Sequence, residues 1–272
     1  MPKLRVGSVP YAVARPLDGE LERHEGIVLT RAVPAVLVEE LRAGSLDVAL
    51  VSSVELFRRP GYRYLAGPVI GTRGRVRSVQ LFLRKPLSEL RTVAMDPASR
   101  TSAALVRGLL GSEDAEGPHF LEVPGDPRAA AADGWLRIGD RALAEALAPD
   151  APPTFNPSEE WCRRTGLPFA FALWIARADV DLTPWRAAFA ASAERGSEQL
   201  ESIAESSAAD LGLPLDAVRE YFFEECLYRL EAAELRRSLR AFRDLLAPHG
   251  LARADLDPEP VAIDGDGGVR VP

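Results

Sequence analysis

Short hydroxyl side chains and helix starts follow three apolar segments of this sequence, and such junctions can bind anions. The junctions are DVALVSSVELF (47–57), RTVAMDPASRTSAALVRGLL (91–110) and WLRIGDRALAEAL (135–147). The first N–H groups of a helix have no intrahelical acceptor and lie at the positive end of the helix dipole, so they attract carboxylates and phosphates. The sequence therefore predicts a site for a small organic anion.

The first junction carries two adjacent serines. Ser52 precedes Glu55 by three residues, which is capping-box spacing. As structure alone, Ser52 would cap a short helix and nothing more. In the functional interpretation, Ser53 offers its hydroxyl and its N–H to a carboxylate.

The second junction carries more donors than a helix cap requires. Ser99, Thr101 and Ser102 surround the expected helix start, and Arg100 adds a guanidinium that can bind a carboxylate through two hydrogen bonds. One hydroxyl would suffice as a cap. This excess favours ligand binding.

Two further candidates have alternative roles. Asp140, at the third junction, is either a general acid or base or the N-cap of the following helix. Tyr11 follows the first strand-like segment and either lines a cleft or packs in the core.

Composition excludes several classes of protein. The 272 residues carry a formal net charge of -7 and no Lys/Arg-rich run, which disfavours a nucleic-acid surface. Two cysteines, Cys162 and Cys226, suggest free thiols in a reducing compartment and neither a disulfide framework nor a zinc site. No GxGxxG after a strand, P-loop or HExxH motif is present, so we expect no cofactor and no metal. There is also no signal-peptide pattern and no apolar run long enough to span a membrane, which predicts a soluble cytoplasmic protein without a membrane partner.

Alternating strand-like and helix-like segments predict an α/β fold. A βαβαβ pattern over 4–51 predicts a parallel sheet with ligand contacts at the carboxyl ends of its strands, and Gly44 is expected to end the second helix. A second βα series, with a short Ala-rich helix near 127–133, lies between the extended segments 77–84 and 168–177.

This order predicts two lobes. We expect one discontinuous lobe of residues 1–85 and 172–272 and an inserted lobe of residues 86–171, with the ligand cleft between them.

The C-terminal third is predicted to be almost wholly helical. Thr183 before Pro184 fits an N-cap, 211–214 breaks the pattern, and the tail after Pro258 is expected to be irregular. An apolar stripe at near-helical spacing indicates core packing; its residues are Val218, Phe222, Leu227, Leu230, Leu235, Leu239, Phe242 and Leu246.

Six motifs occur in an order that resembles the chorismate dehydratases of menaquinone biosynthesis, which serve the futalosine route. They are GSVPYAVARPLDGEL, DVALVSSVELFR, RSVQLFL, SRTSAALVRGLL, RIGDRAL and EEWCRRTGLPFAFALWIAR. The resemblance spans roughly residues 4–177 and is weaker in the C-terminal helices. It implies the two-lobed fold of type II periplasmic binding proteins.

The resemblance implies that chorismate loses water and becomes 3-[(1-carboxyvinyl)oxy]benzoate, without cofactor or metal. Matched motifs imply a substrate site made of Tyr11, Ser52, Ser53, Ser78, Val79, Arg100, Thr101, Ser102, Gly139 and Asp140. Candidates for a catalytic role are Ser53, Thr101 and Asp140.

One position departs from the family pattern. Val13 stands where family members commonly carry Asn, so either another group such as Arg15 replaces the missing amide or the chain is a divergent or impaired dehydratase. A base supplied by the substrate's own side-chain carboxylate is a further alternative.

Two other functions stay open. The related 1,4-dihydroxy-6-naphthoate synthase resembles this fold but relies on a cleft histidine, which the motifs here do not supply. A cytoplasmic binding or sensor protein would clamp an organic anion without converting it. The C-terminal helices either complete the first lobe or form a homodimer interface.

Overall fold

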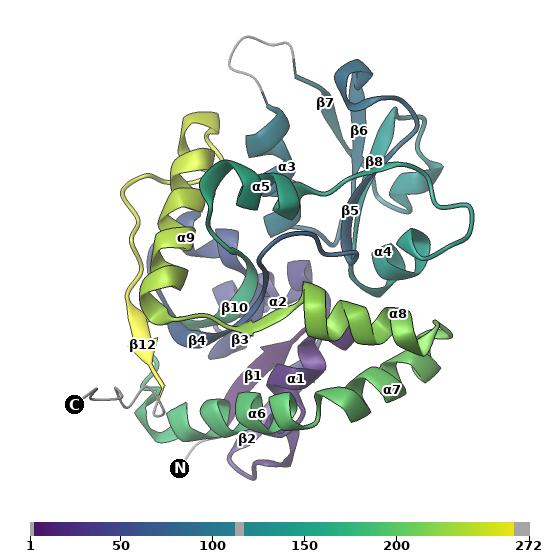
Figure 1. Ribbon diagram of the computed structural model, residues 1–272. Helices are drawn as coiled ribbons and strands as arrows, with labels where there is room; N and C mark the ends of the chain where they lie inside the picture. Colours follow the sequence, from purple (N-terminus) through teal and green to yellow (C-terminus); the bar gives the residue numbers. More distant parts are fainter. Residues whose placement is uncertain (1–2, 112–116, 264–272) are drawn as a thin grey trace, which may run out of the picture.

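The computed structural model of the protein, described for residues 3–111 and 117–263, contains two β-sheets that form two lobes (Figure 1). The first sheet has the order β11-β4-β10-β3-β1-β2, with β12 beside β4. Its strands are β1 (Leu4–Ser8), β2 (Ile27–Arg31), β3 (Val48–Ser52), β4 (Tyr62–Thr72), β10 (Phe169–Arg177), β11 (Leu227–Arg229) and β12 (Pro260–Ala262).

The second sheet has the order β7-β6-β8-β5-β9. Its strands are β5 (Val79–Leu83), β6 (Thr92–Met95), β7 (His119–Glu122), β8 (Gly134–Ile138) and β9 (Thr154–Phe155). Strands β6 and β8 pair in parallel, and β5 pairs antiparallel to β8.

The parallel start of the first sheet is confirmed. β1 pairs in parallel with both β2 and β3, and α2 (Pro34–Ala43) ends at Gly44, whose φ is 76°. All residues of β3 are buried, as expected for a strand covered on both faces. The carboxyl ends of β1 and β3 therefore meet at one edge.

The strand pairing differs from the lobe boundaries expected at residues 85 and 172. β5 belongs to the second sheet, because it pairs with β8 and β9, and all of β10 belongs to the first. The chain thus crosses between the lobes near 73–78 and 156–168. β5 is buried throughout and apolar except for Gln80, and such a strand carries no sequence signal for the sheet it joins.

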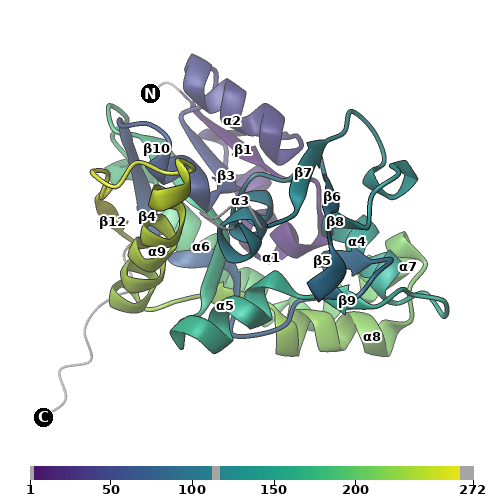
Figure 2. The ribbon, with the colours of Figure 1, turned by 90° about the horizontal axis from the view of Figure 1, so that it is seen from above.

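Helices cover both lobes (Figures 1 and 2). α9 packs against β4 and β10, α6 packs against α1, and α7 and α8 extend from the first lobe past α4 of the second. Their bounds are α1 (Arg15–Asp18), α3 (Thr101–Leu110), α4 (Gly139–Ala146), α5 (Pro157–Thr165), α6 (Arg186–Glu198), α7 (Leu200–Leu211), α8 (Leu215–Glu220) and α9 (Ala232–Leu246). No helix of the described ranges is both long and apolar enough to cross a membrane.

The almost wholly helical structure expected for the C-terminal third is interrupted after the break at 211–214. A π-helical turn (Tyr221–Glu225) ends α8, and the short strand β11 then pairs with β4 before α9 begins. The residues of the stripe are nonetheless in the core or packed against it. The strand forms because β11 can pair with an edge of β4. Helical spacing alone does not exclude a short strand within an otherwise helical pattern.

Three smaller expectations also need correction. α6 begins at Arg186 after a 3-10 turn, so Thr183 is not its N-cap. The Ala-rich segment forms only a 3-10 turn at Pro127–Ala129. Part of the expected irregular tail forms β12, which pairs in parallel with β4, and the rest lies outside the described residues.

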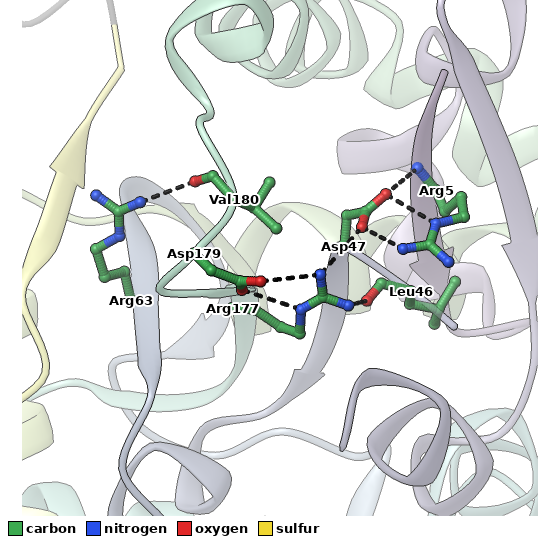
Figure 3. Close-up of polar contacts among 7 residues, drawn as sticks. All are labelled: Arg5, Leu46, Asp47, Arg63, Arg177, Asp179 and Val180. Carbon is green, nitrogen blue, oxygen red and sulfur yellow. Dashed lines mark hydrogen bonds and ion pairs between the residues drawn. The ribbon is translucent and has the colours of Figure 1, made fainter. Parts of the chain in front are cut away.

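A carboxylate at the amino end of β3 links β1 and β10 at the edge of the first sheet opposite the carboxyl ends of β1 and β3 (Figure 3). Asp47 accepts hydrogen bonds from the backbone N–H and the guanidinium of Arg5 at 2.9 and 3.0 Å. Arg177, at the end of β10, lies 3.7 Å from Asp47 and pairs with Asp179. Partial burial acts to raise the pKa of Asp47, but the hydrogen bonds from Arg5 outweigh it and hold the pKa below its ordinary value.

Replacing Asp47 by asparagine should lower the free energy of unfolding at neutral pH by about 1.5–3 kcal/mol, because hydrogen bonds to a charged acceptor are lost. The folded-state pKa is depressed, so this contribution is present above the unfolded pKa of about 4 and disappears as the pH falls through the folded value. Urea unfolding between pH 7 and pH 3 measures the difference. Asp179→Asn, at an exposed carboxylate of the same network, is the control and should change little. A difference between wild type and Asp47→Asn that does not depend on pH would contradict the prediction.

Candidate functional site

A cavity of about 80 Å³ lies where the carboxyl ends of β1, β3, β6 and β8 meet. The three predicted strand-to-helix junctions all contribute to its wall. The predicted residues that line it are Tyr11, Ser52, Ser78, Val79, Arg100, Thr101, Ser102 and Gly139. The two remaining predicted residues, Ser53 and Asp140, are not in the wall.

The start of α3 points its hydroxyls at this cavity. Ser99 accepts a hydrogen bond from the N–H of Ala103 at 3.1 Å, so its side chain provides an acceptor for one N–H group of the first turn of α3. Thr101 and Ser102 are buried in the first turn of α3 and line the cavity. Because the first N–H groups of a helix have no intrahelical acceptor, this turn presents both hydroxyl and N–H donors to an anion.

An aspartate ties the second junction to the third. The carboxylate of Asp96 accepts from the N–H of Ala98 at 2.9 Å and from the N–H of Ile138 at 3.1 Å. Ile138 is the N-cap residue of α4, and Gly139 follows it. The two helix starts of the second lobe are therefore held in a fixed relative position.

Arg100 is the only charged side chain among the described residues that line the cavity. Its guanidinium lies 3.8 Å from Glu39, a distance that makes a loose ion pair, and 32% of the side chain is exposed. A carboxylate in the cavity would find in Arg100 a planar group able to donate two parallel hydrogen bonds.

Thr101 contacts the first lobe directly. Its hydroxyl accepts from the N–H of Val54 at 3.4 Å and lies 3.5 Å from the hydroxyl of Ser53. Ser53 is fully enclosed and donates to the carbonyl of Ala170 at 2.7 Å. The structure thus gives Ser53 a supporting position behind Thr101, in place of the direct ligand contact expected from the sequence.

The expected capping box at the first junction does not form. Ser52 makes no side-chain cap hydrogen bond, and the residues after it form a 3-10 helix (Ser53–Phe57). Glu55 instead pairs with the guanidinium of Arg42 at 2.7 and 2.8 Å. The guanidinium of Arg42 donates two hydrogen bonds to this carboxylate, so Glu55 is not available to complete a capping box. Ser52 lines the cavity.

Gly139, in the second lobe, lies close to the ring of Tyr11 in the first lobe. Gly139 has φ 69°, and a Cβ atom there would lie 2.8 Å from the ring of Tyr11. The N–H of Gly139 donates to the carbonyl of Ser78 at 2.8 Å. Burial, together with the negative charges of Asp96 and Asp140, raises the pKa of Tyr11 to about 12, so its hydroxyl stays neutral.

Asp140 connects the two lobes and is not the N-cap of α4. It lies in the first turn of α4, and its carboxylate accepts from the N–H of Ala12, in the first lobe, at 3.1 and 3.3 Å. Burial raises the pKa of this carboxyl, although the Ala12 N–H and the charge of Arg15 act in the opposite direction. The geometry supports a bridge between the lobes and does not place this carboxylate in the cavity wall.

Replacing Asp140 by alanine should lower the free energy of unfolding by about 1–3 kcal/mol, because the buried N–H of Ala12 loses its acceptor. Urea unfolding measures the loss. Asp150→Ala, at an exposed carboxylate just beyond the same helix, is the matched control and should change the value little. Equal values for the two variants would show that the bridge does not stabilise the fold.

Sequence reasoning missed the apolar part of the wall. It includes Ile70 of β4, Phe171 of β10 and Cys226 after the π-helical turn. Both cysteines are free, as expected, and burial raises the pKa of Cys226 to about 12, so this thiol stays protonated. These residues are far apart in the sequence, and no local pattern indicates that they share a cavity.

Val13 also lines the cavity and is 6% exposed, so it adds an apolar surface where an amide was expected. Arg15 does not replace that amide. Its guanidinium bonds to Asp210 at 2.7 Å and to Ser207 at 3.2 Å, on α7 and away from the cavity. No group of three or more His, Cys, Asp or Glu side chains in the described ranges is placed to hold a metal ion.

Comparison with known proteins identifies relatives over nearly the whole chain. A profile of the menaquinone biosynthesis family matches residues 4–248. The chorismate dehydratase of Thermus thermophilus is 34% identical over 262 residues, which cover 89% of this chain and 94% of that protein.

Solved structures with the same fold include binding proteins. The alkanesulfonate-binding protein of Xanthomonas axonopodis pv. citri, bound to MOPS, has a TM-score of 0.67 at 18% identity. The match covers 94% of this chain and 96% of that protein. The periplasmic aliphatic sulphonate binding protein of Escherichia coli has a TM-score of 0.66 at 20% identity, covering 100% and 97%. The expected two-lobed, periplasmic-binding-protein-like fold is confirmed.

Proposed function

The chain belongs to the menaquinone biosynthesis family, and on that premise we propose that it is a chorismate dehydratase. In this proposal it removes water from chorismate and releases 3-[(1-carboxyvinyl)oxy]benzoate, so it is a carbon–oxygen lyase of the futalosine route. The cytoplasmic location and the homodimer remain predictions from the sequence.

One observation carries the proposal: a single arginine and several neutral donors from both lobes surround one cavity. Chorismate is a dicarboxylate, and carboxylates are the groups that such donors bind. Arg100 offers the positive charge, and the α3 start offers the hydroxyls of Thr101 and Ser102. Ser52 and Ser78 lie on other parts of the same wall.

The chemistry of the elimination explains why neutral donors are useful. Removing the ring proton beside the enolpyruvyl ether leaves negative charge, which delocalises through the diene into the ring carboxylate. The C–O bond of the hydroxyl on the adjacent ring carbon then breaks, the hydroxyl takes up the abstracted proton and departs as water, and the ring becomes aromatic. Donors that hold the ring carboxylate stabilise this growing charge, and each preorganised donor can lower the barrier by about 3–4 kcal/mol.

The proton acceptor is proposed to be the substrate's own side-chain carboxylate. Among the described residues that line the cavity there is no Asp, Glu or His. The protein then acts by holding the two parts of the substrate in a reactive arrangement, which alone can accelerate a reaction by several orders of magnitude. The same lack of a cleft histidine disfavours the 1,4-dihydroxy-6-naphthoate synthase reaction.

A binding or sensor protein is the second candidate. It is favoured by Val13, which leaves an apolar surface in the wall where the family commonly has an amide. Sites for small molecules usually measure about 300–1,000 Å³ and this cavity is much smaller, so in either function we expect the lobes to move apart when a ligand enters.

Genetic complementation tests the proposal. Expression of the chain in a bacterium whose own chorismate dehydratase gene is deleted should restore menaquinone, measured by mass spectrometry of lipid extracts. Arg100→Met should restore less. Absence of menaquinone with wild-type chain that is expressed, folded and able to bind chorismate would favour the binding protein.

A further inference from the structure

A tyrosine hydroxyl lies directly behind one serine of the cavity wall. Tyr221 donates a hydrogen bond to the hydroxyl oxygen of Ser78, and the two oxygens are 2.9 Å apart. Ser78 lines the cavity, whereas Tyr221 is 1% exposed and is not part of the wall. Tyr221 can therefore influence a ligand through Ser78.

The contact with Tyr221 determines which hydrogen bonds the Ser78 hydroxyl can still make. A serine hydroxyl has one hydrogen to donate and two lone pairs that accept. Tyr221 occupies a lone pair of Ser78, so the serine's hydrogen must be donated elsewhere. Within residues 3–111 and 117–263, no other side chain is hydrogen-bonded to that hydroxyl, and its open side is the cavity.

We propose that Tyr221 is a positioning residue that orients the Ser78 hydroxyl as a donor to a carboxylate of the bound substrate. This inference rests on the proposed function, since it concerns how the same cavity holds chorismate. Burial raises the pKa of Tyr221 well above its ordinary value, so the phenol is protonated and able to donate at neutral pH.

The segment that carries Tyr221 is fixed to the crossing between the lobes. The backbone N–H of Arg77 donates to the carboxylate of Glu225 at 2.7 Å, and its guanidinium pairs with Glu225 and, at 2.9 Å, with Glu220. Arg77 precedes Ser78, and Tyr221 begins the π-helical turn that Glu225 ends. π-Helical turns occur frequently at functional sites. Here the turn directs Tyr221 toward the wall from behind.

A double-mutant cycle tests the inference. Tyr221→Phe keeps the ring and removes the hydroxyl, and it should lower kcat/KM for chorismate about tenfold, or about 1.4 kcal/mol. Ser78→Ala should lower it at least as much. The double variant should be no worse than Ser78→Ala alone, because Tyr221 acts through Ser78. Losses that add in full would overturn the inference.

Tyr228 provides the matched control. Its side chain is partly buried and its hydroxyl is buried near the same cysteine, Cys226, and no hydrogen bond joins that hydroxyl to Ser78 among the contacts of the described chain. Tyr228→Phe removes a buried tyrosine hydroxyl from the same neighbourhood and should leave kcat/KM at the wild-type value. Equal losses in Tyr221→Phe and Tyr228→Phe would mean that only packing is affected, which also overturns the inference.

Calorimetric titration with chorismate separates this inference from the proposed function. If the wild type binds chorismate without converting it, the dehydratase proposal fails, and the same cycle is calculated from dissociation constants. Coupling between Tyr221 and Ser78 in binding would then support the positioning role. If the wild type converts chorismate and Tyr221→Phe matches it in both measurements, the positioning role fails and the dehydratase proposal stands.

Discussion

Replacing Arg100 by methionine is expected to lower kcat/KM for chorismate by about 100-fold or more, the usual cost of removing a preorganised donor from a charge-stabilising site. The expected cause is the loss of the only cation in the described cavity wall. Methionine retains much of the side-chain length and none of the charge. Steady-state kinetics, followed by the appearance of an aromatic product, measures the effect.

Two further variants make this prediction specific. Arg100→Lys keeps the charge but cannot form two parallel hydrogen bonds to one carboxylate, so it should recover only part of the activity. Arg195→Met, at an exposed position of α6, should leave the kinetics unchanged. Wild-type kinetics in Arg100→Met would remove this residue from the substrate site.

Gly139→Ala is expected to lower kcat/KM by about 100-fold, since misplacement of a site by about 1 Å can have that cost. A Cβ atom at residue 139 would lie 2.8 and 2.9 Å from ring atoms of Tyr11, so the ring or the start of α4 must shift. The φ of 69° adds strain for any residue with a side chain. Kinetics with chorismate and a melting curve measure the two consequences.

Gly166→Ala separates the clash from the strain. Gly166 has φ 67°, nearly the same backbone conformation, but apart from its own chain neighbours no residue has an atom within 4 Å of the position that a Cβ would occupy. This variant should lose stability through backbone strain and keep its kinetics. If both variants retain wild-type kinetics, the close approach of Tyr11 and Gly139 is not required for the reaction.

Much of the site could be predicted because its signals are local. A strand followed by a helix start places donors at the carboxyl end of the strand, and this geometry depends on neighbouring residues alone. Thr101 and Ser102 are predicted in this way, Gly139 is implied by the matched family motifs, and all three line one cavity. The parallel start of the first sheet was predictable for the same reason.

The remaining features depend on contacts between distant parts of the chain. The hydroxyl of Ser53 is directed to the carbonyl of Ala170, 117 residues away, and Asp140 binds the N–H of Ala12, 128 residues away. Hydroxyl and carboxylate groups have several possible partners, and spacing along the chain does not choose among them. The sequence therefore predicts a functional role for Ser53 and Asp140, but it does not predict which groups these side chains contact.

The position of the C-terminal segment was missed for a related reason. Its apolar stripe has near-helical spacing, but β11 interrupts the helices to pair with the edge of β4. This segment places Cys226 in the cavity wall and Tyr221 behind Ser78 of that wall. Pairing with an open strand edge is a property of the assembled sheet, and the local sequence of the segment does not predict it.

The most direct test of the central claim is incubation of the purified, metal-free protein with chorismate, followed by mass and ultraviolet spectra. The proposed function predicts the loss of one water and the appearance of an aromatic product with the mass of 3-[(1-carboxyvinyl)oxy]benzoate, formed at a rate proportional to the protein concentration. Recovery of intact chorismate, from protein that gains thermal stability in its presence, would contradict the dehydratase and leave a binding protein. Neither conversion nor stabilisation would show that chorismate is not the ligand of this cavity.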